Sequence, residues 1–415
     1  MRMGDARHSV SNNFWIGNNL NDIQQSDTAD FDYQNCITQI VDNYSAKADA
    51  NVAGFSFGTQ YAYTHSHRDL DYSGVNVYNH VSNTYDERLW ASYLEYGRKL
   101  GSGWSVNIGG RYEHVWTKAA NWPTVTVNRT DYGRLFPTFR MSYIPNLAHS
   151  FNWGLSSRIT RPNIINLNPN IVWRDVNHAS FGNQDLKPSY LYKAMMGYTY
   201  KGVLSVDLYY AYEHDRVDAI YSVDKQVTYH SWSNITNEHS IGINSFYNFD
   251  RLHWLTFTLM QGIWYSKTIR PERENAWGAT RRYTYPEVEC FSYVGALQTT
   301  CFFDRDRKWS ANLNATYNSP EKDVTKSLHA RYMVDVGLQH RFWKDCLTIG
   351  LTCRNLITSR IKGTEHLGTT NMDFDNKYNY RQLRLTLSYH FGARLRHHKR
   401  HYESDEMQER LTNDF

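Results

Sequence analysis

Apolar and polar side chains alternate with a period of two along most of this chain. In the stretch VLSVDLYYAY, Leu204, Val206 and Leu208 fall on one face, whereas Ser205 and Asp207 fall on the other. The same alternation recurs in other stretches, among them WSVNIGGRYEHVW (104–116), WSANLNATY (309–317) and CLTIGLTCRNL (346–356). Successive side chains of a strand point to opposite faces, whereas a helix needs a period near 3.6. The pattern therefore predicts an all-β fold.

The gaps between the alternating segments distinguish a membrane barrel from a soluble sandwich or propeller. The predicted strands number about fifteen and lie near residues 33–46, 51–66, 85–99, 104–116, 131–144, 149–158, 190–201, 203–217, 237–249, 252–266, 289–303, 308–318, 330–343, 346–357 and 378–391. Short turns, such as GSG at 101 and DRL at 250, alternate with long polar stretches, such as 159–189 and 267–288. Outer-membrane barrels have short periplasmic turns and long outer loops. We therefore predict an antiparallel transmembrane β-barrel with about 15–16 strands in this chain.

Aromatic residues stand at the predicted strand ends. Trp104 and Trp309 follow tight turns, whereas Tyr143 and Phe342 come just before such turns. Rings at these positions match the interfacial girdles of outer-membrane barrels, although in a soluble sandwich they would cap a core. Because no internal repeat of about 40–50 residues is visible either, a propeller is disfavoured.

Composition excludes several other classes. No run of about 18 apolar residues is present, so no transmembrane helix is expected. The net charge of +4 gives no reason to expect a nucleic-acid partner. Residues 1–30 contain no apolar core of a signal peptide. The five cysteines lack CxxC spacing, which indicates neither a metal site nor a disulfide framework, and Cys290 with Cys301 is the one pairing to test.

The last predicted strand has the pattern of a strand that closes a barrel. Leu383, Leu385, Leu387 and Tyr389 alternate with polar residues, and Phe391 ends the segment. We expect outer-membrane lipid to contact this face and the barrel-assembly machinery to recognise the strand. An unpaired strand edge is not tolerated in lipid, so the strand must pair with the first one.

These features divide the chain into a polar N-terminal segment (1–30), an outer-membrane β-barrel (31–392) and a charged periplasmic tail (393–415). If the last strand runs inward, the strand near 33–46 also runs inward and starts outside the cell. Single-chain bacterial barrels have an even number of strands and both ends in the periplasm. At least one upstream strand is therefore missing from the count, and residues 10–22 are a weak candidate for it.

The chain resembles a known family in several motifs. RLFPTFRMSYI, SSRITRPNIINLNPNI, FGNQDLKPSYLYKAMMGYTY and the closing LTLSYHFG are similar to the C-terminal barrel portion of TonB-dependent receptors, and most closely to the outer-membrane β-barrel family common in Bacteroidetes. The matching positions of the family's loop and turn are Arg161, Pro162, Leu167, Asn168, Pro169, Gly182, Asn183, Leu186, Lys187 and Pro188. Gln184 replaces the usual Pro of the turn, and Ser189 replaces the usual Glu.

The resemblance implies uptake of a scarce ligand, such as a metal chelate, cobalamin or an oligosaccharide, through a 22-stranded barrel in the cell outer membrane. It implies no cofactor. The family's signal peptide, plug and TonB-contacting segment have no counterpart in the sequence, which leads us to expect an N-terminally truncated product. Any contact with the TonB system would then depend on a plug that this chain lacks.

Aromatic residues of the predicted long loops and two arginines that flank the family loop are the candidate ligand contacts: Arg158, Arg161, Trp173, Tyr229, Trp232 and Trp277. Aromatic rings can stack on a sugar or chelate ring, but the same rings would also suit a surface near the girdle. Lumen-facing positions such as Arg111, Glu113, Arg140 and Arg384 would either line a path for a charged solute or neutralise one another.

Two other functions stay open. A porin-like or structural barrel without a plug would have the same strand pattern. An outer-membrane hydrolase is less favoured, because neither GxSxG nor HExxH occurs in the sequence. The clusters HSHRDLD at 65 and HHKRH at 397 are more simply solvated histidines than metal ligands, so we predict a non-enzyme without a metal site.

Overall fold

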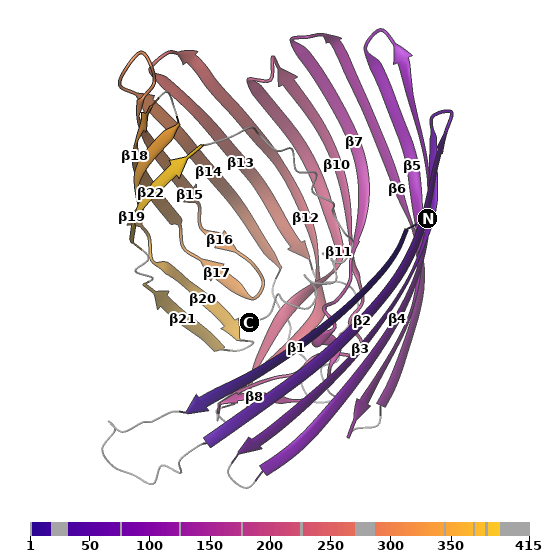
Figure 1. Ribbon diagram of the computed structural model, residues 1–415. Helices are drawn as coiled ribbons and strands as arrows, with labels where there is room; N and C mark the ends of the chain where they lie inside the picture. Colours follow the sequence, from indigo (N-terminus) through magenta and orange to yellow (C-terminus); the bar gives the residue numbers. More distant parts are fainter. Residues whose placement is uncertain are drawn as a thin grey trace, which may run out of the picture.

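Long antiparallel strands make up nearly all of the described chain (Figure 1). The computed structural model describes residues 2–17, 32–74, 77–123, 126–175, 177–224, 227–269, 287–343, 346–367, 370–377 and 381–390. Within these ranges no helix is long and apolar enough to cross a membrane. The strands are β1 (Arg2–Gly17), β2 (Asp32–Val52), β3 (Phe55–Gly74), β4 (Val77–Gly101), β5 (Trp104–Trp122), β6 (Thr126–Asn146), β7 (His149–Thr160), β8 (Val172–Asp175), β9 (His178–Ser180), β10 (Ser189–Tyr200), β11 (Leu204–Asp224), β12 (Val227–Leu252), β13 (Leu255–Ile269), β14 (Val288–Phe302), β15 (Trp309–Asn318), β16 (Glu321–Lys322), β17 (Lys326–Leu328), β18 (Arg331–Phe342), β19 (Leu347–Thr358), β20 (Ile361–Leu367), β21 (Thr370–Asn376) and β22 (Gln382–Tyr389).

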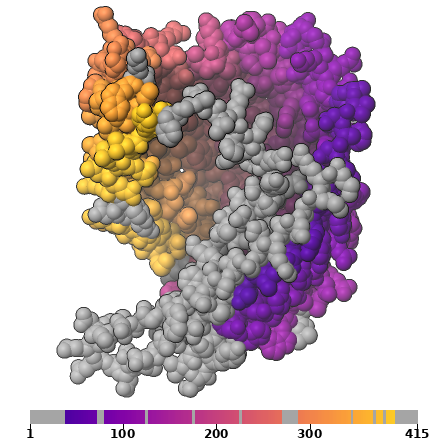
Figure 2. All heavy atoms as spheres, viewed as in Figure 1, coloured from indigo at the N-terminus to yellow at the C-terminus, as the bar shows by residue number. Residues whose placement is uncertain are grey.

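Sixteen of the described strands form one curved wall, in which each strand pairs antiparallel with the next in the order β1–β7, β10–β15, β18, β19, β22. The short strands β8 and β9 attach to this wall because β9 pairs in parallel with β12. A separate small sheet contains β16, β17, β20 and β21. The wall encloses a hollow, which Figure 2 shows between the orange and the indigo-to-magenta strands.

Several strands of the wall are longer than a bilayer crossing requires. β4 has 25 residues and β12 has 26, whereas a tilted strand of about 9–11 residues crosses a bilayer. In Figure 1 tight turns join the strands at the upper end, and strands such as β2 and β4 reach far toward the lower end. Long loops lie outside the cell in such barrels, so the lower half of these strands projects beyond the membrane on the outer side.

The two faces of the wall differ in polarity. The outer face carries half-exposed apolar side chains such as Leu155, Leu208 and Ile243, which are 55%, 46% and 49% exposed. The inner face carries Ser, Thr and Asn, and these bond to one another: Thr300 Oγ1 donates to Asn312 Oδ1 at 2.9 Å. An apolar outer face and a hydrogen-bonded inner face suit the wall of a barrel that lies in lipid and has a water-filled lumen.

Aromatic rings form a band along the tight-turn end, as the sequence predicted. Trp104 stacks on Tyr143 with ring centroids 4.3 Å apart, and Trp309 lies 4.2 Å from the His340 ring. Phe342 contacts the same histidine edge-on at 4.0 Å. Phe391 lies outside the described residues. The band marks the inner membrane–water boundary of the wall.

The N-terminal segment forms a longer strand of the wall than the sequence predicted. β1 pairs with β2 over its whole length, from Arg2 opposite Lys47 to Gly17 opposite Asp32, whereas only a weak strand near 10–22 was expected within the polar segment 1–30. The stretch RMGDARHSVSNNFWIG lacks alternation, which is why no strand was predicted at its start. With β1 the wall has an even number of strands, and the chain enters and leaves it on the same side.

A disulfide between Cys290 and Cys301 is excluded. Both residues lie on β14, eleven positions apart, and both are free thiols. A strand rises about 3.3 Å per residue, so their Cα atoms are roughly 36 Å apart. The pairing considered from the sequence was therefore wrong, because the two cysteines flank no turn.

Two glycines of one tight turn provide a test of the turn geometry. Gly101 and Gly103 both have positive φ angles, +81° and +84°, but a Cβ on Gly103 would lie 2.1 Å from the Ile144 carbonyl oxygen, whereas one on Gly101 meets nothing within 4 Å. Gly101→Ala is expected to cost about 1–2 kcal/mol for the left-handed backbone, and Gly103→Ala about 1 kcal/mol more for the forced shift. Urea unfolding in detergent followed by tryptophan fluorescence checks this, and equal losses would contradict it.

The terminal strand tests which face contacts lipid. Leu385 is 65% exposed in the middle of β22, and Thr386 faces the lumen. Leu385→Arg is expected to lower the free energy of unfolding by about 2–4 kcal/mol, because it places a charge near the bilayer midplane. Thr386→Arg is the matched control and is expected to cost less than 1 kcal/mol, since the lumen is wet. Folding titrations in lipid vesicles measure both, and the reverse order would show that the faces are misassigned.

Candidate functional site

The family loop, residues 161–188, folds back onto the inner face of the wall. It leaves β7, forms a short 3-10 helix η1 (Ile165–Leu167), and returns to β10. Ile164 is 3% exposed and packs with Tyr85 of β4 and Ala119 of β5, and Leu167 covers the same cluster. Burial of these apolar side chains holds the first half of the loop inside the barrel.

The two halves of the family motif bind each other. The Gly182 N–H donates to the Asn168 carbonyl at 2.6 Å, and the Asn183 N–H donates to the Asn166 carbonyl at 2.6 Å. A Cβ on Gly182 would lie 2.4 Å from the Asn166 carbonyl oxygen. Only glycine allows this close approach of two backbones, which gives the Leu-Asn-Pro and Gly-Asn segments of the motif a structural reason.

The second half of the loop attaches to β12. Lys187 N–H donates to Asn234 Oδ1 at 2.8 Å, and Asn234 Nδ2 donates back to the Lys187 carbonyl at 2.9 Å. Asn183 Nδ2 donates to the Trp232 carbonyl at 3.2 Å. The loop is thus fixed to β4–β5 on one side and to β12 on the other, and in the wall these are separated by β6, β7, β10 and β11. We call residues 161–188 the strap.

A buried ion pair fixes the start of the strap. Arg161 and Glu113 are paired, with side chains only 6% and 9% exposed. The other carboxylate oxygen of Glu113 accepts from Arg111 Nε at 2.6 Å, and Arg111 donates to Gln60 Oε1 at 3.3 Å. Of the predicted lumen-facing charges, Arg111 and Glu113 therefore neutralise one another. Arg161 holds the strap to the wall, and a role of this residue in ligand binding stays a prediction.

The space left under the strap is small. A cavity of about 40 Å³ lies between strap and wall and is lined by Tyr85, Glu87, Arg161, Leu167 and Leu186, among others. This volume holds a few water molecules at most. A ligand of the sizes considered above would have to bind on the open side of the strap.

The structure brings together two of the four predicted aromatic contacts. Trp173 on β8 meets Tyr229 on β12 edge-on, with ring centroids 6.3 Å apart. Trp232 lies on the opposite face of β12, because it is three positions from Tyr229, and it packs against His230 at 4.4 Å. Trp277 lies outside the described residues.

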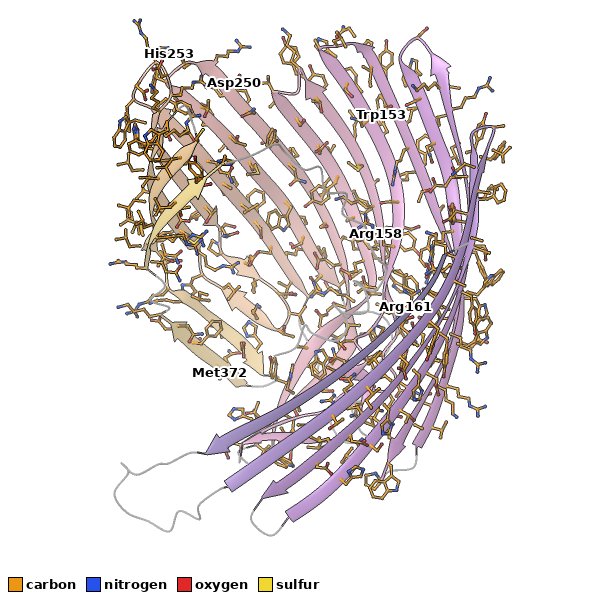
Figure 3. All side chains as sticks on the ribbon, in the orientation of Figure 1. Trp153, Arg158, Arg161, Asp250, His253 and Met372 are labelled. Carbon is orange, nitrogen blue, oxygen red and sulfur yellow. The ribbon has the colours of Figure 1, made fainter. Side chains whose placement is uncertain are left out.

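Arg158 and Arg161 have different environments although both were predicted to contact ligand. Figure 3 places Arg158 midway along the wall and Arg161 nearer to the long-loop end. Arg158 is exposed on the lumen face of β7 and forms no ion pair with any residue in the described ranges. Of the two, only Arg158 has a guanidinium that a solute in the lumen can reach.

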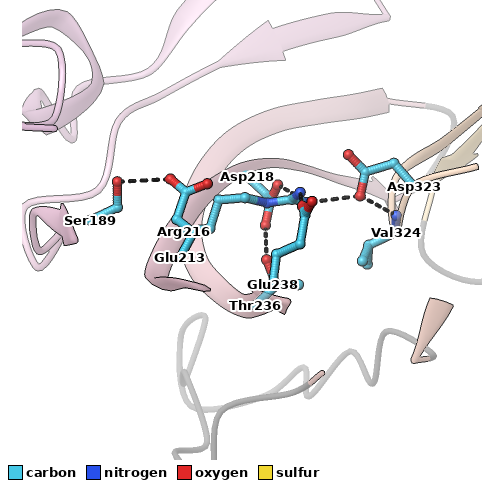
Figure 4. A network of polar contacts seen from close by, with 8 residues as sticks. All are labelled: Ser189, Glu213, Arg216, Asp218, Thr236, Glu238, Asp323 and Val324. Atoms are coloured by element: carbon cyan, nitrogen blue, oxygen red, sulfur yellow. Dashed lines mark hydrogen bonds and ion pairs between the residues drawn. The ribbon is translucent and has the colours of Figure 1, made fainter. Parts of the chain in front are cut away.

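A second charged cluster, around Arg216, was not predicted (Figure 4). Arg216 contacts Asp218 at 2.7 Å and Asp323 at 2.6 Å and also pairs with Glu238. Asp218 in turn accepts from the Thr236 hydroxyl. Asp323 precedes Val324, which is 1% exposed, so the cluster ties the loop that carries β16 and β17 to the wall.

The comparison with protein families decides the identity. Residues 4–389 match the outer membrane protein beta-barrel family. The chain belongs to this family. The predicted antiparallel β-barrel and its location in the outer membrane are thereby confirmed. No curated protein sequence matches the chain.

Solved structures with a similar fold are larger receptors. The ferric yersiniabactin uptake receptor FyuA from Yersinia pestis has a TM-score of 0.58 and 10% identity, covering 90% of this chain and 56% of that one. The ferric citrate transporter FecA in the unliganded form gives 0.60 and 10%, with 93% and 58% covered. The copper transporter OprC gives 0.58 and 12%, with 90% and 60% covered. The family member thus spans less than two thirds of these proteins, and its likeness to the barrels of TonB-dependent receptors is confirmed for the fold.

Proposed function

We propose that this protein forms the barrel of an outer-membrane uptake receptor for a scarce ligand. The observation that carries the proposal is the strap, which is fixed to two distant parts of the inner wall and crosses a polar lumen in its outer half. FyuA, FecA and OprC are named for ferric chelates and copper, so a metal chelate is the first ligand class to test, before cobalamin and oligosaccharides.

Energy for uptake would come from the TonB system through a plug in the lumen. We propose that another part of the protein or a second chain supplies that plug. Outer-membrane lipid and the barrel-assembly machinery complete the proposed partners, since the exposed leucines of β22 suit both. Catalysis is not part of the proposal, and hydrolysis of lipid or peptide substrates by the folded protein, above that of a heat-inactivated sample, would contradict it.

Gene deletion in the source organism tests the proposal. Uptake of radiolabelled ferric chelates, copper and cobalamin, and of labelled oligosaccharides, is measured at limiting concentration in the deletion strain, in a strain without TonB, and in the parent. Loss of uptake of one ligand in both mutant strains supports a TonB-coupled receptor. Loss only in the deletion strain indicates a porin-like barrel instead, and unchanged uptake of every ligand contradicts the proposal.

A further inference from the structure

Three cationic side chains surround one serine on the lumen face of the wall. Lys193 of β10 lies directly opposite Ser156 of β7. Arg140 of β6 lies opposite Gly154, which makes it a diagonal neighbour of Ser156, and Arg158 follows two positions after Ser156 on the same strand. Neighbours at such offsets are about 5–8 Å apart. The four residues therefore form one patch, which we call the cationic patch.

The side chains of the patch face the lumen. Their strand neighbours Met141, Leu155 and Ala194 lie on the outer face, where Leu155 is opposite Ala194 and Met141 is opposite Trp153. Arg140 and Arg158 are exposed and belong to the lumen face of β6 and β7. Both guanidinium groups are consequently open to a dissolved solute.

Cations of the patch lack the partners that other inner cations have. Arg161 and Arg216 are paired with buried carboxylates, whereas Arg140, Arg158 and Lys193 make no ion pair with any residue that the structure describes. The charged group of Lys193 does contact an aromatic ring, because its Nζ lies 4.7 Å from the centre of the Tyr209 ring.

Two carboxylates of β11 face the lumen near the patch. Glu213 lies two positions after Ala211 and is a diagonal neighbour of Lys193, but its Oε1 accepts from the Ser189 hydroxyl at 3.1 Å, and it forms no ion pair with Lys193. Asp207 lies opposite Gly197, whereas Lys193 lies opposite Ala211, which puts four residues, roughly 13 Å, between Asp207 and the partner of Lys193. The lumen face of β13–β15 is uncharged, with residues such as Thr256, Thr258, Gln298, Thr300, Asn312, Asn314 and Thr316. The three cations of the patch therefore outnumber the one carboxylate that is a diagonal neighbour of the patch, Glu213.

Unneutralised charges at membrane depth are costly and mark the paths of solutes. Arginine binds carboxylate or phosphate with two parallel hydrogen bonds, and lysine adds a point charge. We propose that Arg140, Arg158 and Lys193, with the Ser156 hydroxyl, bind a solute that carries several carboxylate or phosphate groups. This inference rests on the proposed function, since it names the ligand class of the receptor's lumen.

Binding of a trianionic probe to the purified full chain tests the patch. Citrate binding is measured by calorimetry at low ionic strength for the wild type and for Arg140→Gln, Arg158→Gln and Lys193→Gln. Each variant is expected to bind citrate about tenfold more weakly, the loss of one charge-assisted hydrogen bond. Arg384→Gln, which removes a lumen-facing cation from β22, is the matched control and is expected to change the affinity less than twofold. Circular dichroism confirms that all four variants fold.

Each other result would overturn the inference. Wild-type protein that does not bind citrate, or patch variants that bind it as the wild type does, would remove the site. An equal loss in Arg384→Gln would show that the whole lumen, and not the patch, attracts the anion. Because binding is measured on purified protein without TonB, it can succeed while the uptake experiment fails, and the two proposals are thus tested separately.

Discussion

Replacing Glu113 by alanine is expected to lower the free energy of unfolding by about 3–5 kcal/mol. The substitution leaves the guanidinium of Arg161 buried, at 6% exposure, without its carboxylate. It also removes the partner of Arg111 Nε. A buried charge without a counter-charge costs far more than the attraction that the pair contributes, and the strap is the element that can move to relieve it. Urea titration in detergent measures the loss, and faster proteolysis within residues 161–188 locates it.

Two further variants test whether the stability loss in Glu113→Ala comes from a buried charge left without its partner. Glu113→Leu combined with Arg161→Met replaces the pair with apolar side chains and is expected to recover most of the stability, as such replacements of buried pairs commonly do. Glu289→Ala removes the partner of Lys267 in a pair that is 42% and 54% exposed, and is expected to cost less than about 1 kcal/mol. If Glu113→Ala is no worse than Glu289→Ala, the pair does not hold the strap.

The fold could be predicted from the sequence because the two faces of each membrane-spanning strand contact different solvents. Lipid on one side and water on the other require alternation at every crossing, and Leu383, Leu385 and Leu387 show this in its simplest form. β1 was predicted only weakly, near 10–22, because its sequence does not alternate, and its full length is defined by pairing with β2. Where a strand extends beyond the membrane, both faces are in water or covered by loops, and the pattern no longer identifies it.

The site was predictable only where it depends on local chain geometry. Gly182 and Asn168 belong to a motif, and the motif exists because their backbones touch. Trp173 and Tyr229 were each predicted as ligand contacts in long loops, and the structure places them on β8 and β12 with their rings in contact. Which face Trp232 takes depends on the register of β12. The Arg216 cluster had no signal at all, because Asp323 is 107 residues away in the sequence and only the docking of a loop brings it near.

Replacing Arg216 by alanine is expected to lower the free energy of unfolding by about 3–5 kcal/mol at neutral pH. The Arg216 and Asp218 side chains are 15% and 10% exposed, and without the cation the carboxylates of Asp218, Glu238 and Asp323 face one another. The loop with β16 and β17 loses its tie to the wall at the same time. Arg331→Ala is the matched control, because its pair with Glu321 is 32% and 39% exposed, and about 1 kcal/mol or less is expected there.

The deficit of Arg216→Ala is also expected to depend on pH. Asp218 lies fourteen positions after the start of β11, past the roughly ten residues that cross the bilayer. Burial raises its pKa above the ordinary carboxyl value, although Arg216 and the Thr236 hydroxyl lower it. Removing Arg216 removes one of the lowering effects, so the pKa in the folded variant rises further. A group with a raised folded pKa contributes stability that is fully present below its unfolded pKa and is lost as pH rises through the folded pKa.

Stability differences between Arg216→Ala and the wild type, measured at each pH from 4 to 8, check this sign. The deficit is expected to be largest at pH 7–8 and to shrink as the pH falls toward the ordinary carboxyl pKa of about 4, where protonated Asp218 no longer needs a cation. Subtracting the wild type at each pH removes the titration of groups elsewhere in the barrel. A deficit that stays constant, or grows on acidification, would mean that Arg216 acts through packing of its stem and not through its charge.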